Sequence, residues 1–230
     1  MIISHKHKFI FLKTSKTAGT SIEIALSMFC GPDDVITPIA PEDEEIRNRL
    51  GYRVPQNYHS PSPDDNSGDV SRFLQKSQIN FLYYNHAPAS EVRARVGWQV
   101  WENYFKFCVA RNPWDRCVSR YYWEYTSEPR PSFSGFVDSK FPLMLMLRGF
   151  GLYTIDGQAA VDKICRFENL EEDLEAVRIR SDIPEKLDLP HAKSRFRKDR
   201  RSYREYYGEN EINKIAGIFR DEINLLGYEF

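Results

Sequence analysis

The feature that most constrains the fold of this chain is an apolar run that leads directly into a turn rich in lysine, glycine and hydroxyl residues. The run is Phe9-Ile10-Phe11-Leu12, the turn is Lys13-Thr14-Ser15-Lys16-Thr17-Ala18-Gly19-Thr20-Ser21, and a helical pattern follows from Ile22. A strand that passes through such a turn into a helix N-terminus is typical of a phosphate-binding loop, because backbone amides, hydroxyls and an ammonium group can donate to one anion. The pattern predicts an α/β domain with an anion site near its start.

The candidate anion-binding residues in this turn are Lys16, Thr17, Ala18, Gly19, Thr20 and Ser21. The order of these residues differs from the nucleotide-binding pattern G-x-x-x-x-G-K-[ST], in which the lysine directly follows the last glycine. Here Lys16 precedes Gly19, and no glycine opens the turn. A lysine-rich turn that binds nothing remains the alternative on this segment alone.

A second segment has the same organisation. Residues 104–110 read as a buried strand and lead into Arg111-Asn112-Pro113, where Pro113 suits the first turn of a helix. Ser119 then lies about two helical turns further on. An arginine fork and a hydroxyl can hold a terminal phosphate through charge-assisted hydrogen bonds. The alternatives are that Arg111 pairs with a carboxylate and that Ser119 is an ordinary helix-face residue.

The two motifs, in this order, resemble those of carbohydrate-type sulfotransferases, such as the heparan sulfate 2-O-sulfotransferase and chondroitin sulfotransferases. Segments 164–174, 189–194, 203–207 and 221–230 resemble later parts of the same enzymes. The resemblance implies a fold related to nucleotide kinases and the donor 3′-phosphoadenosine 5′-phosphosulfate, with a hydroxyl acceptor, by expectation a carbohydrate. It implies that residues 16–21 hold the 5′-phosphosulfate, that Lys16 stabilises the leaving oxygen, and that Arg111 and Ser119 hold the 3′-phosphate.

His86 is the candidate general base for the acceptor hydroxyl. It follows an expected strand at residues 80–84, and ligands of parallel α/β sheets bind beyond the carboxyl ends of the strands. Imidazole has a pKa suited to proton transfer near neutral pH, and the resembling enzymes carry a histidine after the corresponding strand. His86 could instead cap the helix expected at residues 90–96. Glu91 and Glu124 are the reserve candidates.

A strongly basic segment, residues 191–204, is expected to form a flap near the donor. Its candidate donor contacts are Lys193, Ser194 and Arg195, because a basic loop at this place contacts the donor in the resembling enzymes. A charge run of this kind is equally consistent with a solvated face.

The remaining pattern indicates one domain, residues 1–230, built on a central parallel sheet with helices on both faces. The expected strands are residues 7–13, 80–84, 104–110 and 163–167, and the clearest helix is residues 212–226 before Gly227. Residues 52–69 and 128–157 are expected to be loops, the second forming the acceptor region. Phe133, Phe136 and Phe141 in that region could line an acceptor pocket, although core packing is the more ordinary use of such side chains.

Composition narrows the choice of function. The formal net charge of −1 gives no reason to expect bulk attraction to nucleic acid or to anionic membranes. The four cysteines lack metal-ligand spacing, and no apolar stretch is long enough for a signal segment or a membrane span. We expect a cytoplasmic, bacterial enzyme that needs no metal. The alternatives are a metal-dependent small-molecule kinase and a non-catalytic nucleotide-binding module, and the oligomeric state stays open.

Overall fold

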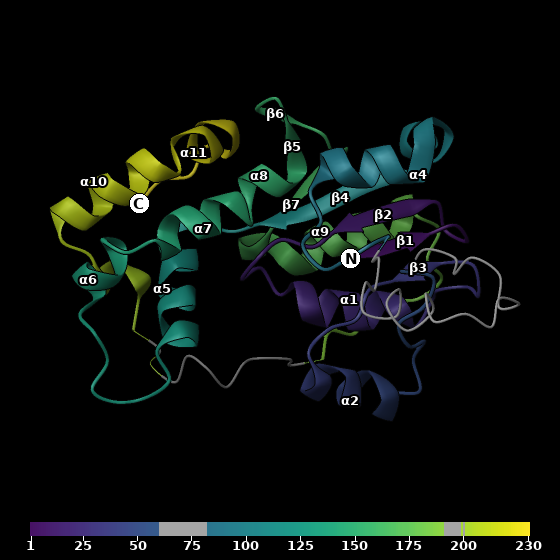
Figure 1. Cartoon of the computed structure of the whole chain (residues 1–230), viewed down its shortest axis with the longest axis horizontal. Coiled ribbons are helices and arrows are strands. Elements are labelled where there is room, and N and C mark those ends of the chain that lie inside the picture. The colour runs from purple at the N-terminus through teal and green to yellow at the C-terminus, as the bar shows by residue number, and fades with distance from the viewer. Residues whose placement is uncertain (60–81, 191–198, 200) are drawn as a thin grey trace, which may run out of the picture.

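The computed structural model of the protein describes residues 1–59, 82–190, 199 and 201–230. Its centre is a five-stranded sheet in the order β3-β1-β2-β4-β7 (Figure 1). The strands are β1 (Ile2–Ser4), β2 (Phe9–Leu12), β3 (Val35–Ile36), β4 (Phe105–Ala110) and β7 (Lys163–Arg166). Three of the expected strands are confirmed as β2, β4 and β7.

The sheet is mixed, so the expectation of a parallel sheet is wrong for one half of it. Strand β2 runs parallel to β4, and β4 runs parallel to β7, whereas β1 is antiparallel to both β2 and β3. Only a short turn joins β1 to β2, and such a connection permits only antiparallel pairing. The parallel half places Leu12 opposite Cys108, so that β2 and β4 end side by side.

The expected strand at residues 80–84 is wrong for its described part. Residues 82–84 form bends and coil, with the Tyr83 N–H donating to the Tyr58 carbonyl at 3.0 Å. Tyr83 is buried in an apolar cluster that also contains Met1 and Ile3. Burial therefore accounts for the apolar pattern of this segment without a place in the sheet.

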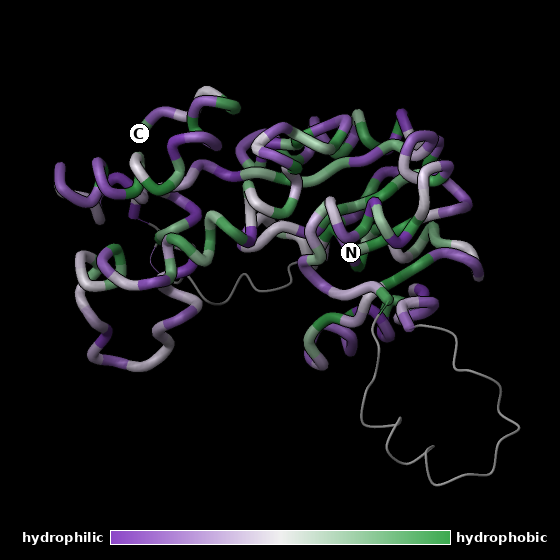
Figure 2. Tube along the Cα trace, turned by 45° about the horizontal axis from the view of Figure 1, so that its top comes forward, coloured by the Kyte–Doolittle hydropathy of each residue, from purple (hydrophilic) through white to green (hydrophobic). Residues whose placement is uncertain are grey.

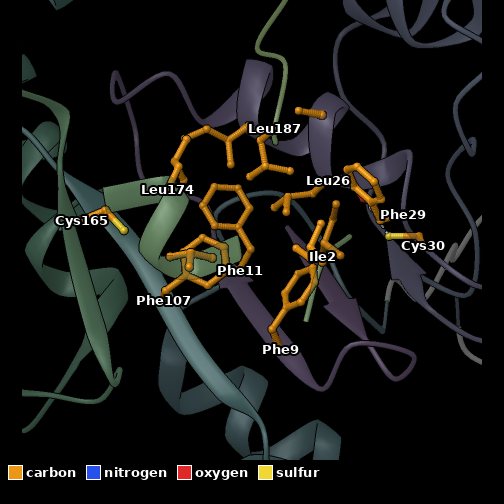
Figure 3. Packing of buried hydrophobic residues seen from close by; sticks show 14 of the residues in the cluster. Ile2, Phe9, Phe11, Leu26, Phe29, Cys30, Phe107, Cys165, Leu174 and Leu187 are labelled. Carbon is orange, nitrogen blue, oxygen red and sulfur yellow. Dashed lines mark hydrogen bonds between the residues drawn. The ribbon is translucent and has the colours of Figure 1, made fainter. Parts of the chain in front are cut away.

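Helices cover both faces of the sheet, as expected. One face packs against α1 (Gly19–Ser27) and α9 (Leu170–Arg180), and its core includes Phe11, Phe107 and Leu174 (Figure 3). The other face packs against α4 (Ala89–Asn103) and α8 (Phe150–Tyr153). The alternation of side chains along each strand divides the apolar residues between these two cores, and the central strands are among the most hydrophobic segments in Figure 2.

A third core lies beside the sheet and is formed mainly by helices. It is formed by α5 (Pro113–Glu124), α6 (Phe133–Val137), α7 (Phe141–Leu147), α10 (Glu209–Ile218) and α11 (Arg220–Leu226), which group together on the left of Figure 1. The expectation of loops at residues 128–157 is therefore wrong. Phe136 is fully buried and stacks on Phe141, so these aromatic side chains support a packed core.

The C-terminal helix is divided in two. Phe219 has φ −102° and ψ 16°, which ends α10 and begins α11, although the apolar spacing continues through both. Gly227 ends α11 with φ 63°, the left-handed conformation expected of a helix stop. Residues 52–59 are coil with isolated bridge residues at Gln56 and His59, as expected of a loop, and the rest of the loop predicted at residues 52–69 lies outside the described residues.

The other elements are short. They are α2 (Pro41–Arg49), the hairpin of β5 (Thr154–Ile155) and β6 (Gln158–Ala159), and the 3₁₀ turns η1 (Phe167–Asn169) and η2 (Tyr203–Tyr206). All four cysteines are buried free thiols. Among the helices described, none combines the length and the apolarity needed to cross a bilayer.

Candidate active site

The predicted anion-binding turn connects the end of β2 to the start of α1. Lys16 and Ala18 both have left-handed backbone conformations, with φ 66° and 60°. Residues that alternate in this way turn successive N–H groups toward one concave surface. A Cβ atom on Gly19 would lie 2.8 Å from Lys13 Cγ, so only glycine permits this close approach.

The N-terminus of α1 is open to a ligand. Its N-cap residue, Ala18, offers no side-chain hydrogen bond to the first turn. The first backbone N–H groups of a helix need partners outside the helix, and they attract anions. Thr17, Gly19, Thr20 and Ser21 line the same cavity as this helix end, so the turn has the form that the sequence predicts for it.

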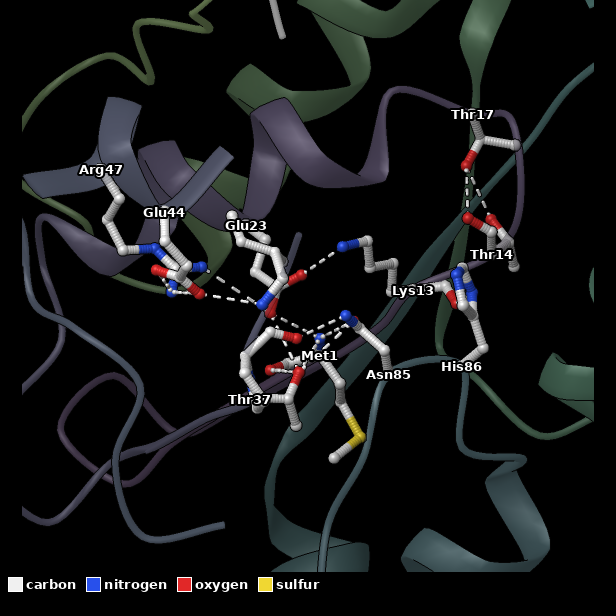
Figure 4. A network of polar contacts seen from close by, with 12 residues as sticks. Met1, Lys13, Thr14, Thr17, Glu23, Thr37, Glu44, Arg47, Asn85 and His86 are labelled. Carbon is white, nitrogen blue, oxygen red and sulfur yellow. Dashed lines mark hydrogen bonds and ion pairs between the residues drawn. The ribbon is translucent and has the colours of Figure 1, made fainter. Parts of the chain in front are cut away.

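A buried ion pair between Glu23 and Lys13 supports the turn. No role for either side chain was predicted from the sequence. Glu23 is fully buried in α1 and accepts from Lys13 Nζ at 2.7 Å, and it lies 2.9 Å from the Met1 amino group (Figure 4). Burial alone would raise the pKa of Glu23, but these positive charges outweigh it and lower the pKa to about 2. The available signal was one acidic residue in an apolar helix pattern.

Arg111 brings the second motif to the first. It follows β4, and its Nη1 donates to the Lys16 carbonyl at 3.2 Å, across 95 residues of sequence. Asp115 accepts from Nε at 2.8 Å and from Nη2 at 2.7 Å, and the guanidinium lies 4.1 Å from the centre of the Phe167 ring. The partners of Arg111 therefore hold its planar group at the edge of the turn.

The helix after Arg111 begins as predicted. The Asn112 side chain caps α5 by accepting from the N–H groups of Trp114 and Asp115 at 3.1 and 3.3 Å, and Pro113 occupies the first turn. Ser119 lies on the side of α5 that faces the cavity. Its hydroxyl makes no hydrogen bond within the part of the chain that the structure describes.

His86 reaches the same cavity from the segment before α4. Its backbone is left-handed, with φ 61°, and its Nδ1 donates to the Lys13 carbonyl at 2.8 Å. This bond fixes the tautomer in which Nε2 is the acceptor. Burial is the main cause that lowers the pKa of His86 to about 4, and the charge of Lys13 adds to it. The ring is therefore neutral at physiological pH and able to take a proton.

The alternatives considered for this part of the site were a helix-capping role for His86 and two glutamates as the base. Helix α4 has Pro88 as its N-cap and no side-chain cap, so His86 does not cap it. Glu91 pairs with Arg95 at 2.7 Å and Glu124 with Arg120 at 2.6 Å, and neither glutamate lines the cavity.

These groups line a common cavity of about 460 Å³. Its described lining contains cationic side chains and no carboxylate. The lining also includes residues that sequence reasoning missed, namely Asn85, Arg120, Trp123, Arg148 and Phe167. Arg120 and Trp123 follow Ser119 on the same helix, which was an available signal, whereas nothing in the local sequence marks Arg148. The flap candidates Lys193, Ser194 and Arg195 lie outside the described residues.

Trp123 forms one wall of the cavity. Lys16 Nζ lies 5.5 Å from the centre of its ring, and the Arg120 guanidinium lies 4.4 Å from the same ring and 5.3 Å from that of Phe141. These distances are in the range of cation–π contacts. The wall therefore brings two cations together at an aromatic surface.

Comparison with known proteins gives a family for the chain. The model of the family described as "Sulfotransferase family" matches residues 1–229. An uncharacterized protein of Archaeoglobus fulgidus is 37% identical over 107 residues, which cover 44% of this chain and 88% of that protein. No solved structure matches the chain.

Proposed function

Because the chain belongs to the sulfotransferase family, we propose that it transfers the sulfuryl group of 3′-phosphoadenosine 5′-phosphosulfate to a hydroxyl group of a carbohydrate acceptor. The observation that carries this proposal is the contact between Arg111 Nη1 and the Lys16 carbonyl. It joins two anion-binding motifs at one cavity that has no carboxylate in its described lining. A donor with phosphate groups at both ends of an adenosine suits such a pair of sites.

The roles proposed for the donor site follow from the donors available in each motif. The amides and hydroxyls of residues 17–21 hold the 5′-phosphosulfate at the open end of α1. Arg111 and Ser119 hold the 3′-phosphate, which distinguishes this donor from ordinary adenylates. Lys193, Ser194 and Arg195 remain proposed donor contacts.

The proposed reaction is an in-line displacement at sulfur. The acceptor oxygen forms a bond to sulfur while the bond between sulfur and the bridging oxygen breaks, and the acceptor proton passes to His86 Nε2. Lys16 stabilises the charge that grows on the bridging oxygen, and such help raises the rate because it is strongest in the transition state. The products are a sulfate ester and 3′-phosphoadenosine 5′-phosphate. None of these steps assigns a role to a metal ion.

Calorimetry tests the donor assignment. We expect 3′-phosphoadenosine 5′-phosphate to bind at least about tenfold more tightly than AMP or ATP, because a phosphate held by a charged fork contributes about 1.5–3 kcal/mol. A screen of sugars with radiolabelled donor, with and without chelator, then tests turnover. Preference for ATP with loss of activity on chelation would indicate a kinase instead, and binding without turnover of any acceptor would indicate a nucleotide-binding module.

A further inference from the structure

Arg148 is a cation in the active-site cavity that the proposed reaction does not use. It caps the C-terminus of α7, its side chain is exposed, and it lines the cavity. Among the described residues, its guanidinium has no ion pair and no hydrogen bond. The other arginines of the lining have carboxylate partners, Asp115 at 2.7 Å from Arg111 and Glu124 at 2.6 Å from Arg120.

Arg148 lines the same cavity as His86, Arg120 and Trp123. Burial is the first cause that lowers the pKa of His86, and the charge of Arg148 contributes in the same direction. Burial is also the first cause that lowers the pKa of Arg120; Glu124 opposes this shift, and the charge of Arg148 adds to it. Arg148 therefore shares the cavity with the proposed base and with the aromatic wall.

The backbone of Arg148 is fixed on two sides. Its carbonyl accepts from the Ser15 N–H at 2.8 Å, which ties the end of α7 to the donor turn. The next residue, Gly149, lies against the buried Arg116, where a Cβ atom would clash with the guanidinium group. The side chain therefore extends from a rigid base whose position follows that of the donor turn.

The charge of Arg148 adds, after that of Lys13, to the cost of a positive charge on His86. Proton transfer makes His86 cationic, and a neighbouring cation disfavours that state. An oxyanion on the acceptor would pair with Arg148 and remove this repulsion at the moment of transfer. It would also accept two hydrogen bonds from a guanidinium that has no protein partner among the described residues.

We propose that Arg148 selects acceptors that carry an oxyanion group, such as a carboxylate or a sulfate, near the hydroxyl that is modified. This inference rests on the proposed function, because it places the acceptor beside His86. Arg148 acts here as a specificity-determining residue, with no part in bond breaking.

Binding in the dead-end complex tests this role without requiring turnover. The protein is saturated with 3′-phosphoadenosine 5′-phosphate and titrated with p-nitrophenyl β-D-glucuronide or p-nitrophenyl β-D-glucoside, which differ by one carboxylate. We expect the glucuronide to bind at least about tenfold more tightly, the effect of one charge-assisted hydrogen-bonded pair. Arg148→Gln should abolish the difference, and Arg148→Lys should retain part of it, because lysine keeps the charge without the fork.

The control is Arg220→Gln, which removes an exposed arginine of α11 that does not line the cavity. It should leave both affinities and their ratio unchanged. Equal affinity of the wild-type complex for the two glycosides, including failure of both to bind, would overturn the role of Arg148. So would a loss of nucleotide affinity in Arg148→Gln, which would assign the residue to the donor. Failure of the wild-type protein to bind the nucleotide would instead contradict the proposed function.

Discussion

At the scale of single residues, the site depends on how each side chain is held by its neighbours. His86 shows this most clearly, because the sequence alone suggests an imidazole with an ordinary pKa near 6.5. In the structure the ring is buried, donates from Nδ1 to a carbonyl and has a pKa of about 4. The residue was correctly placed near the other motifs, but its titration depends on burial that no local pattern reveals.

The pH profile of the reaction follows from this lowered pKa. Because the pKa of His86 is about 4, the ring is neutral and able to accept a proton at every pH above that value. We expect kcat/KM to stay level from about pH 8 to about pH 5 and to fall below about pH 4, with circular dichroism used to confirm that the protein remains folded. A decline that begins near pH 6.5 would mean that the ring titrates as a solvated imidazole.

The role proposed for Lys16 can also be tested with a single substitution. If it stabilises the leaving oxygen, Lys16→Ala should lower kcat about a hundredfold or more, the usual effect of removing one preorganised donor. Single-turnover rates measure this directly. Lys186→Ala is the control, since that lysine is exposed and lies away from the cavity. A rate near that of the parent protein would remove Lys16 from the mechanism.

Substitution of Arg111 tests which phosphate group of the donor this residue binds. Arg111→Ala should weaken 3′-phosphoadenosine 5′-phosphate about ten- to a hundredfold, as expected for lost hydrogen bonds to a charged group. It should have little effect on AMP, which lacks the 3′-phosphate. Calorimetry with both nucleotides makes the comparison, and equal losses for the two would contradict the assignment.

At the scale of elements, the junction of β2 and α1 determines whether the proposed donor site forms. The strand, the turn and the helix start were predictable because apolar residues, Gly19 and hydroxyl residues follow one another without interruption. Residues 133–147 were not, because their helices are short and are stabilised by aromatic contacts with α5 and α10 that are distant in sequence. Local propensity carries little information about helices of five or seven residues.

Gly19→Ala is the mutation that tests this junction. The added methyl group would lie 2.8 Å from Lys13 Cγ, so we expect a loss of about 1–3 kcal/mol in the free energy of unfolding, with weaker nucleotide binding. Urea denaturation and calorimetry measure the two effects. In contrast, Gly217→Ala in α10 meets no atom within 4 Å and should be neutral or stabilising. Identical behaviour of the two variants would show that α1 does not require the close approach.

At the scale of the whole molecule, the mixed sheet and the buried charges were the least predictable features. The two-residue strand β3 is too short to leave a periodic signal, and β1 becomes a strand through pairing with it and with β2. Glu23 of α1 forms ion pairs with Lys13, which directly follows β2, and with the amino group of Met1. A guanidinium nitrogen of Arg47 in α2 lies 3.9 Å from the Glu23 carboxylate. Such a cluster depends on tertiary proximity, and no spacing in the sequence indicates it.

The stability of the molecule should depend on Glu23. Glu23→Gln leaves Lys13 buried beside a neutral side chain, and we expect a loss of about 3–5 kcal/mol in the free energy of unfolding, measured by urea denaturation. The folded-state pKa of about 2 is below the ordinary value of 4.5, so the contribution of Glu23 is complete above about pH 4.5 and is lost as the pH falls toward 2. Glu171→Gln, which breaks an exposed pair, should change nothing measurable. Equal effects of both changes would contradict the structural role of Glu23.

The hydrogen bond from Arg111 to the Lys16 carbonyl also has a practical meaning for inhibitor design. The two proposed anion sites, joined in this way, would act as a bivalent receptor, in which attachment of one end of a ligand raises the effective concentration of the other. Small fragments such as inorganic sulfate or adenosine 3′-phosphate would each occupy half of it with low affinity. A compound that spans both halves with a rigid linker would bind far more tightly than either fragment alone.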